Sequence, residues 1–167
     1  MNTTNLTTPA ANIPTLPLQG VAPITHLGVI KIEGDDAAKF IHGQLTQDFS
    51  LLDLNTARLA AFCSAKGRMQ ASFIGFKRNA TEILLVCSKD MLPATLKRLS
   101  MFVMRAKAKL SDVSSEYALF GLLGNATKTI ADTPYSTWAK AEFGTMTVVN
   151  LYPADGVARQ LCIAPVG

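Results

Sequence analysis

The sequence predicts an α+β fold in which ferredoxin-like, split βαβ units form mostly antiparallel sheets with flanking helices. Three observations favour this class. A hairpin pattern spans residues 59–76, helical periodicity is confined to short segments, and strand patterns surround each of them. The order strand, helix, strands, helix, strand is typical of such folds, and the chain has no internal repeat.

The hairpin at 59–76 is the centre of this prediction. Two apolar runs flank the tetrad 65–68, and Gly67 supplies the positive φ that a tight turn requires. We therefore expect the other elements either to pack on this hairpin or to extend its sheet.

The segment before the hairpin predicts a strand and a helix. Residues 26–33 alternate like a strand, and Gly34 ends it. Asp35 is expected to cap a helix whose apolar stripe is Ala37, Phe40 and Ile41, with Gly43 at its end. The polar loop 44–48 follows, and its Thr and Asp side chains are expected to bond their own backbone.

The segment after the hairpin predicts a turn at 78–80 and a strand at 82–87 that is apolar nearly throughout, as in a strand covered on both faces. Ser88 is expected to cap a helix reaching Val103 along the stripe Leu92, Leu96, Leu99 and Val103. Residues 107–110 then predict an edge strand.

The last third predicts three further elements. Residues 117–121 form a strand, and Asn125 caps a helix through Ile130. Segments 145–151 and 158–163 pair as a hairpin around the turn 153–156.

Composition limits the domain organisation and the compartment. The 167 residues fit one ordinary domain, and 49% of them are apolar. We assign 1–25 as a flexible leader rich in Pro and Thr, and 26–167 as the domain, incomplete at its C-terminal end. No apolar run approaches a membrane-spanning length, so we expect no membrane partner. The three separated cysteines suggest no disulfide framework and fit a reducing, cytoplasmic setting.

The charge is unevenly distributed. The net charge is +4, yet ten basic residues and only two acidic ones lie between positions 66 and 109. Such a segment attracts polyanions, either RNA phosphates or a polyglutamate tail, although a solvated face gives the same pattern.

The chemistry-bearing motifs are few. The sequence shows no phosphate loop, catalytic triad or metal-ligand set, which removes most hydrolase and metalloenzyme classes. Three polar groups remain as candidates: Lys66 with Arg68 at the hairpin turn, Gln44 with Thr46 and Asp48 in the loop, and Gln70 with Ser72 on one strand face. Each group also has a purely structural interpretation, as a solvated turn, a self-capped loop or a solvent-facing strand.

Taken together, several motifs resemble the amino-terminal half of the YgfZ proteins, folate-binding relatives of the glycine cleavage T-protein (aminomethyltransferase). They are IEGDD at 32–36 with Phe40, GQLTQD at 43–48, LAAFC at 59–63 and AKGRM at 65–69. The resemblance implies a three-domain ring around a tetrahydrofolate cavity and a role in maintaining iron–sulfur enzymes, including those that thiolate tRNA. The family motif KGCYTGQE belongs to the second half and is absent here.

The resemblance also implies site residues. Where the T-protein carries an Asp pair that assists one-carbon transfer, this chain has Ala71 and Ser72. A hydroxyl cannot replace a carboxylate in stabilising an iminium or moving a proton near neutral pH. Cys87 is assigned the position of a T-protein Asn, and Leu59 that of a pocket aromatic. The expected folate-binding residues are Leu59, Lys66, Arg68, Gln70, Ser72 and Cys87.

The sequence therefore predicts a tetrahydrofolate-binding, YgfZ-like accessory protein of iron–sulfur cluster assembly or repair and tRNA modification, with no catalytic residue of its own. Its expected partners are folate and iron–sulfur enzymes or assembly factors, with tRNA as a further candidate. One alternative is a tetrahydrofolate-dependent aminomethyltransferase that uses Asp48. The other is a basic RNA-binding module.

Overall fold

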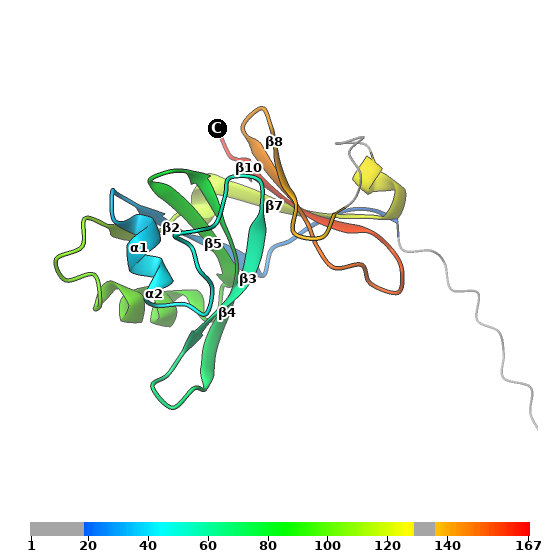
Figure 1. The fold of residues 1–167 in the computed structure, drawn as a ribbon. Coiled ribbons are helices and arrows are strands. Elements are labelled where there is room, and N and C mark those ends of the chain that lie inside the picture. Colours follow the sequence, from blue (N-terminus) through cyan, green and yellow to red (C-terminus); the bar gives the residue numbers. More distant parts are fainter. Residues whose placement is uncertain (1–18, 129–135) are drawn as a thin grey trace, which may run out of the picture.

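Two five-stranded antiparallel sheets pack face to face in the computed structural model, which describes residues 19–128 and 136–167 (Figure 1). The first sheet has the strand order β3-β4-β5-β2-β6 and the second β1-β7-β10-β9-β8. Every strand pairing in both sheets is antiparallel. The prediction of an α+β fold with antiparallel sheets and flanking helices is confirmed.

The first sheet comprises β2 (Leu27–Glu33), β3 (Ala57–Cys63), β4 (Met69–Asn79), β5 (Glu82–Ser88) and β6 (Lys109–Asp112). Helices α1 (Ala37–His42) and α2 (Leu92–Ser100) cover one of its faces. The apolar side chains of both helices bury Phe73, Leu85 and their neighbours, which explains why the helices need only one apolar side each.

The second sheet covers the other face of the first. It comprises β1 (Gly20–Pro23), β7 (Tyr117–Leu123), β8 (Lys140–Phe143), β9 (Met146–Asn150) and β10 (Arg159–Pro165), with the 3₁₀ turns Ser114–Glu116 and Gly124–Lys128 around β7. Phe76, Leu84 and Val86 of the first sheet meet Val149 and Leu161 of the second. Strand β5 is therefore buried on both faces, as its continuous apolar run predicts.

Every strand that the sequence predicts is present, with shifted boundaries. The sequence misses two edge strands, β1 and β8, because each has only four residues and shows too little periodicity to be recognised. Strand β1 lies inside the leader predicted for 1–25, so the ordered domain begins before residue 26. Strand β6 lies two residues later than the predicted 107–110.

The predicted helix caps are wrong. The N-cap residues are Asp36 and Met91 instead of Asp35 and Ser88, and neither side chain caps its helix. The Asp36 carboxylate instead accepts a hydrogen bond from the Lys107 backbone N–H at 2.8 Å, a long-range partner that a local pattern cannot reveal.

Two helix extents also differ from the prediction. Helix α2 ends at Ser100, before Val103, although Val103 still packs against the core. The turn that follows β7 is a 3₁₀ helix beginning at Gly124, so the predicted Asn125 cap is wrong; its expected end at Ile130 lies outside the described residues.

No helix among the described residues is long and apolar enough to cross a membrane.

Gly34 and Gly43 flank helix α1 and provide a matched test of the fold. Gly34 has φ +132°, and a Cβ atom there would lie 2.2 Å from the Lys107 carbonyl oxygen. Gly43 has φ −73°, and a Cβ atom there would meet only ordinary contacts of 3.5 Å or more.

We predict that Gly34→Ala lowers the free energy of unfolding by about 2 kcal/mol or more, because the methyl group both strains the backbone and overlaps a carbonyl. Gly43→Ala should change it by less than about 1 kcal/mol. Denaturant unfolding measures both, and equal effects at the two positions would contradict the described path of residue 107 across the start of α1.

Candidate functional site

Strand β4 is longer than its neighbour β5, and this difference creates the candidate site. Strand β4 has 11 residues and β5 has 7. Their pairing begins at Ile74 opposite Val86, so residues 69–73 of β4 are not paired with β5, whose last two residues pair only with β2. The chain turns at Ser88 toward α2, which leaves space beside the extended part of β4.

A pocket of about 210 Å³ occupies this space and is called here the strand-end pocket. Its lining residues are Met69, Gln70, Ala71, Ser72, Ser88 and Met91. None of them is charged. The polar groups that they offer are two hydroxyls, one amide and backbone atoms. Each of these groups can hydrogen-bond to a ligand, and none of them is charged.

Leu59 and Ser72 lie on one face of the β3–β4 hairpin. The register pairs Leu59 with Ile74 and Ala61 with Ser72, so Leu59 and Ser72 are diagonal neighbours across two strands. Leu59 is 46% exposed and Ser72 is exposed as well, whereas Ile74, next along this face, already packs against the second sheet. The structure thus brings two predicted site residues together on an uncovered part of the sheet.

Gln70 also reaches this region, but through an irregularity in the strand. Phe62 pairs with Ala71 and Cys63 with Met69, so Gln70 is the extra residue of a β-bulge. The sequence predicts Gln70 and Ser72 on one strand face because side chains alternate, but the bulge breaks this alternation at Gln70. Its side chain nevertheless lines the strand-end pocket together with Ser72.

Lys66 and Arg68 are exposed at the tip of the same hairpin. The Ser64 carbonyl accepts a bond from Gly67 N–H at 2.9 Å, and Ser64 N–H donates to the Arg68 carbonyl at 2.8 Å. With Gly67 at φ +74°, the turn forms as predicted. It presents two cations next to the uncovered face of the hairpin that carries Leu59 and Ser72, called here the open face.

Cys87 lies apart from these residues. Its side chain is 3% exposed and belongs to the core beneath the helices, on the opposite face of the sheet from Ser72. Burial raises the pKa of the Cys87 thiol to about 11, with the charge of Asp112 adding to the effect. The structure therefore does not place Cys87 on the pocket.

Ser88 is the residue at this strand end that sequence reasoning missed. It follows Cys87, points to the other face because side chains alternate, and lines the strand-end pocket with Ser72. The alternation of side chains along β5, counted from the buried Val86, is the sequence signal that identifies Ser88.

The loop 44–48 supports the hairpin. Thr46 Oγ1 accepts a bond from Ala61 N–H at 2.9 Å, and Thr46 N–H donates to the Ala61 carbonyl at 3.0 Å, so the loop closes part of the β3 edge. Asp48 Oδ1 accepts bonds from the backbone of Ser50 and Leu51, as expected for a self-capped loop, and lies 3.2 Å from His42 Nδ1.

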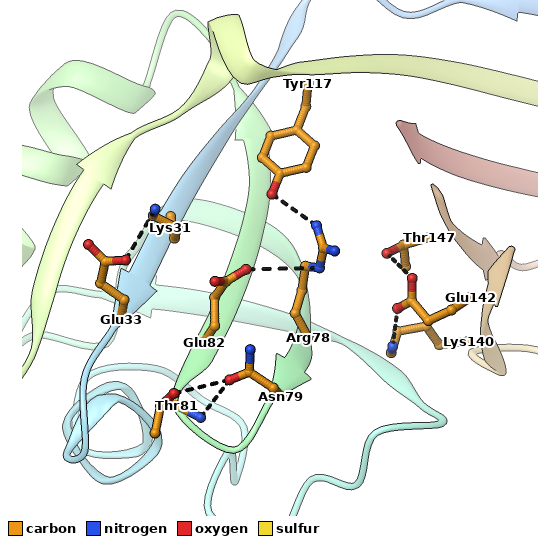
Figure 2. A network of polar contacts seen from close by, with 10 residues as sticks. All are labelled: Lys31, Glu33, Arg78, Asn79, Thr81, Glu82, Tyr117, Lys140, Glu142 and Thr147. Carbon is orange, nitrogen blue, oxygen red and sulfur yellow. Dashed lines mark hydrogen bonds and ion pairs between the residues drawn. The ribbon is translucent and has the colours of Figure 1, made fainter. Parts of the chain in front are cut away.

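Polar contacts between the sheets fix the orientation of the first sheet (Figure 2). Arg78 Nη1 donates to Tyr117 Oη at 3.0 Å, and its Nε lies 3.9 Å from Glu82. In the second sheet, buried Lys140 donates to Glu142 at 2.6 Å and lies 5.7 Å from the centre of the Phe76 ring. These contacts join β4 to β7 and β8 at the end of β4 away from the pocket.

Within residues 19–128 and 136–167, no group of three or more His, Cys, Asp or Glu side chains is arranged to hold a metal ion.

Comparison with known proteins identifies the family. The model of the GCVT N-terminal domain matches residues 19–160. The chain belongs to this family. The match includes β1, in agreement with its place in the second sheet.

Named relatives of this GCVT-domain chain fall into three groups. It is 28% identical over 121 residues to an aminomethyltransferase of Shouchella clausii, covering 70% of this chain and 33% of that protein. It is 25% identical over 121 residues to the tRNA-modifying protein YgfZ of Colwellia psychrerythraea, covering 72% and 37%. It is 28% identical over 109 residues to a mitochondrial iron–sulfur cluster assembly factor IBA57 homolog of Mycosarcoma maydis, covering 58% and 27%.

The solved structure of the glycine cleavage aminomethyltransferase T of Bartonella henselae superposes with a TM-score of 0.77 at 15% identity, over 89% of this chain and 42% of that one. This similarity establishes the fold. The GCVT-domain chain spans about a third of the length of the curated relatives described above. The resemblance to the amino-terminal half of YgfZ proteins is confirmed.

The three cysteines provide a test of this site geometry. We predict that a thiol reagent at pH 8 labels half-buried Cys63 in the native state, while Cys87 and Cys162 react only at the rate of unfolding. Burial raises the pKa of both buried thiols to about 11, which leaves little of the nucleophilic thiolate.

Mass spectrometry of labelled peptides measures the three rates, with the chain unfolded in guanidinium as the control in which all three react. If Cys87 were labelled as fast as Cys63, the assignment of Cys87 to the core would be contradicted, and its side chain would instead face the strand-end pocket.

Proposed function

We propose that this chain binds tetrahydrofolate on the open face of the β3–β4 hairpin and serves as an accessory protein of iron–sulfur cluster assembly or repair, including the enzymes that modify tRNA. Membership of the GCVT N-terminal domain family supports the folate part. The names of the YgfZ and IBA57 relatives support the iron–sulfur and tRNA part.

The observation that carries the proposal is the uncharged strand-end pocket. A pterin ring is flat, and its edge carries both hydrogen-bond donors and acceptors, which suit the Ser72 and Ser88 hydroxyls and the Gln70 amide. Met69 and Met91 supply polarizable sulfur for the ring itself. A largely apolar pocket with a few convergent polar groups is the usual form of a small-molecule site.

The same pocket argues against aminomethyl transfer. Ala71 and Ser72 stand where the T-protein resemblance implies an Asp pair, and no carboxylate lines the strand-end pocket. General acid or base catalysis near neutral pH requires a group that ionises there. We therefore propose folate as a ligand of this chain, with turnover left to other proteins.

We predict that Ser72→Leu weakens tetrahydrofolate binding at least about tenfold, because it removes a hydroxyl and fills the pocket with an apolar side chain. Isothermal titration calorimetry under anaerobic, reducing conditions gives the dissociation constant. Ser50→Leu, also an exposed serine but outside the pocket, is the matched control. Equal affinity of both variants and the unaltered chain would reject this pocket as the folate site.

The hairpin cations provide a second prediction. Replacing Lys66 and Arg68 together by Ala should weaken a polyglutamylated tetrahydrofolate by about tenfold and the monoglutamate by less, because each further carboxylate adds a charge contact. Lys39→Ala, an exposed cation on α1, is the control. If neither ligand distinguishes the double variant from the unaltered chain, these cations face a partner and not the folate tail.

The cellular role has its own test. Deleting the gene from its own organism should lower the specific activity of iron–sulfur enzymes in cell extracts, and the unaltered chain should restore that activity whereas Ser72→Leu should not. Restoration by both would show that the iron–sulfur role does not need folate in this pocket. Unchanged activity after deletion would reject the iron–sulfur role.

A further inference from the structure

A second and larger concavity lies on the helix side of the hairpin. It has a volume of about 380 Å³ and runs between the distal hairpin, at Phe62 and Gln70, and one side of helix α2, at Met91, Ala94, Arg98 and Met101. Buried Thr95 and Phe62 form its floor. We call it the α2 groove.

Exposed methionines border this groove. Met91 and Met101 line it and are 43% and 68% exposed, and Met69, which is 66% exposed, lines the strand-end pocket. Unpartnered apolar side chains of this size are unusual on a monomer when they gather at one concavity. Methionine is unbranched and polarizable, and it adapts to the side chains of a docking partner at little cost.

The charged residues that line the groove have one sign. They are Lys97 and Arg98, both are exposed, and neither forms an ion pair within the described residues. The first turn of α2 has no acidic residue. An acidic partner would meet these cations without displacing an existing carboxylate.

We propose that the α2 groove docks an amphipathic helix of a partner protein that carries carboxylates around a row of apolar side chains. The apolar row would cover Met91 and Met101, and the carboxylates would face Lys97 and Arg98. A helix laid in a groove is a common form of peptide recognition, and opposite charges at the rim fix its register and raise its association rate.

Two other polyanions fit the groove less well. Single-stranded RNA requires exposed aromatic side chains on which bases stack, and Phe62, the one aromatic residue that lines the groove within the described part of the chain, is 5% exposed. A folate polyglutamate tail has carboxylates but no apolar side chains to cover the methionines. The groove shares Gln70 and Met91 with the strand-end pocket, but Lys97, Arg98 and Met101 lie outside that pocket, so the docking proposal does not rest on folate binding.

The test uses a synthetic, fluorescein-labelled peptide of about 16 residues, amphipathic and helix-forming, with Leu at i, i+3, i+4 and i+7, Glu beside that row and Ala elsewhere. Fluorescence anisotropy should show binding to the unaltered chain that weakens with salt. Reversing Lys97 and Arg98 to Glu should weaken it at least about tenfold. Met101→Glu should weaken it similarly, and ¹³C-methyl resonances of Met91 and Met101 should shift when the peptide is added.

Two matched controls accompany these variants: Lys39→Glu for the charge reversals and Leu51→Glu, at an exposed apolar side chain, for Met101→Glu. Both controls should bind the peptide as the unaltered chain does, and all variants should retain tetrahydrofolate affinity. Absence of peptide binding, or binding insensitive to the groove variants, overturns the proposal. Equal affinity for an oligoglutamate lacking Leu also overturns it, because the groove would then bind charge alone. Displacement of the peptide by equimolar tRNA overturns it as well, because the groove would then be a nucleic-acid site.

Discussion

The site depends on strand β5 being buried on both faces. Helices α1 and α2 cover one face and the second sheet covers the other, and the turn after Ser88 leads from this buried strand directly into α2. Strand β4 extends further and forms a hairpin with β3 (Figure 1). Both concavities, the strand-end pocket and the α2 groove, lie where this hairpin passes the end of β5.

At this end of the molecule, an uncharged pocket lies beside exposed cations. Ser72, Ser88 and Gln70 offer neutral hydrogen-bonding groups in the strand-end pocket, while exposed cations lie at the hairpin tip and along α2. Neutral donors and acceptors recognise a heterocycle, whereas exposed cations attract anions over a longer range but with little selectivity. The lining of the strand-end pocket therefore suits a neutral, hydrogen-bonded ligand.

Much of the fold follows from local patterns, but the site follows from contacts across the sheet. The hairpin turn at Gly67, the doubly buried strand β5 and the turn at residues 153–156 have strong local signals and form as predicted. The Asp36 carboxylate does not cap its helix, because it accepts a hydrogen bond from the backbone of Lys107, which is distant in sequence. Alternation along β5 puts Cys87 and Ser88 on opposite faces, but only the packing of the helices and the second sheet shows that the pocket lies on the Ser88 side.

The most direct measurement is the backbone amide spectrum of isotope-labelled chain during titration with tetrahydrofolate. The account predicts that the amide resonances of Gln70, Ser72 and Ser88 shift most and that those of Lys97 and Met101 in the α2 groove shift little. Shifts confined to the α2 groove, or no shift at concentrations well above those of cellular folate, would contradict a folate site at the end of β5.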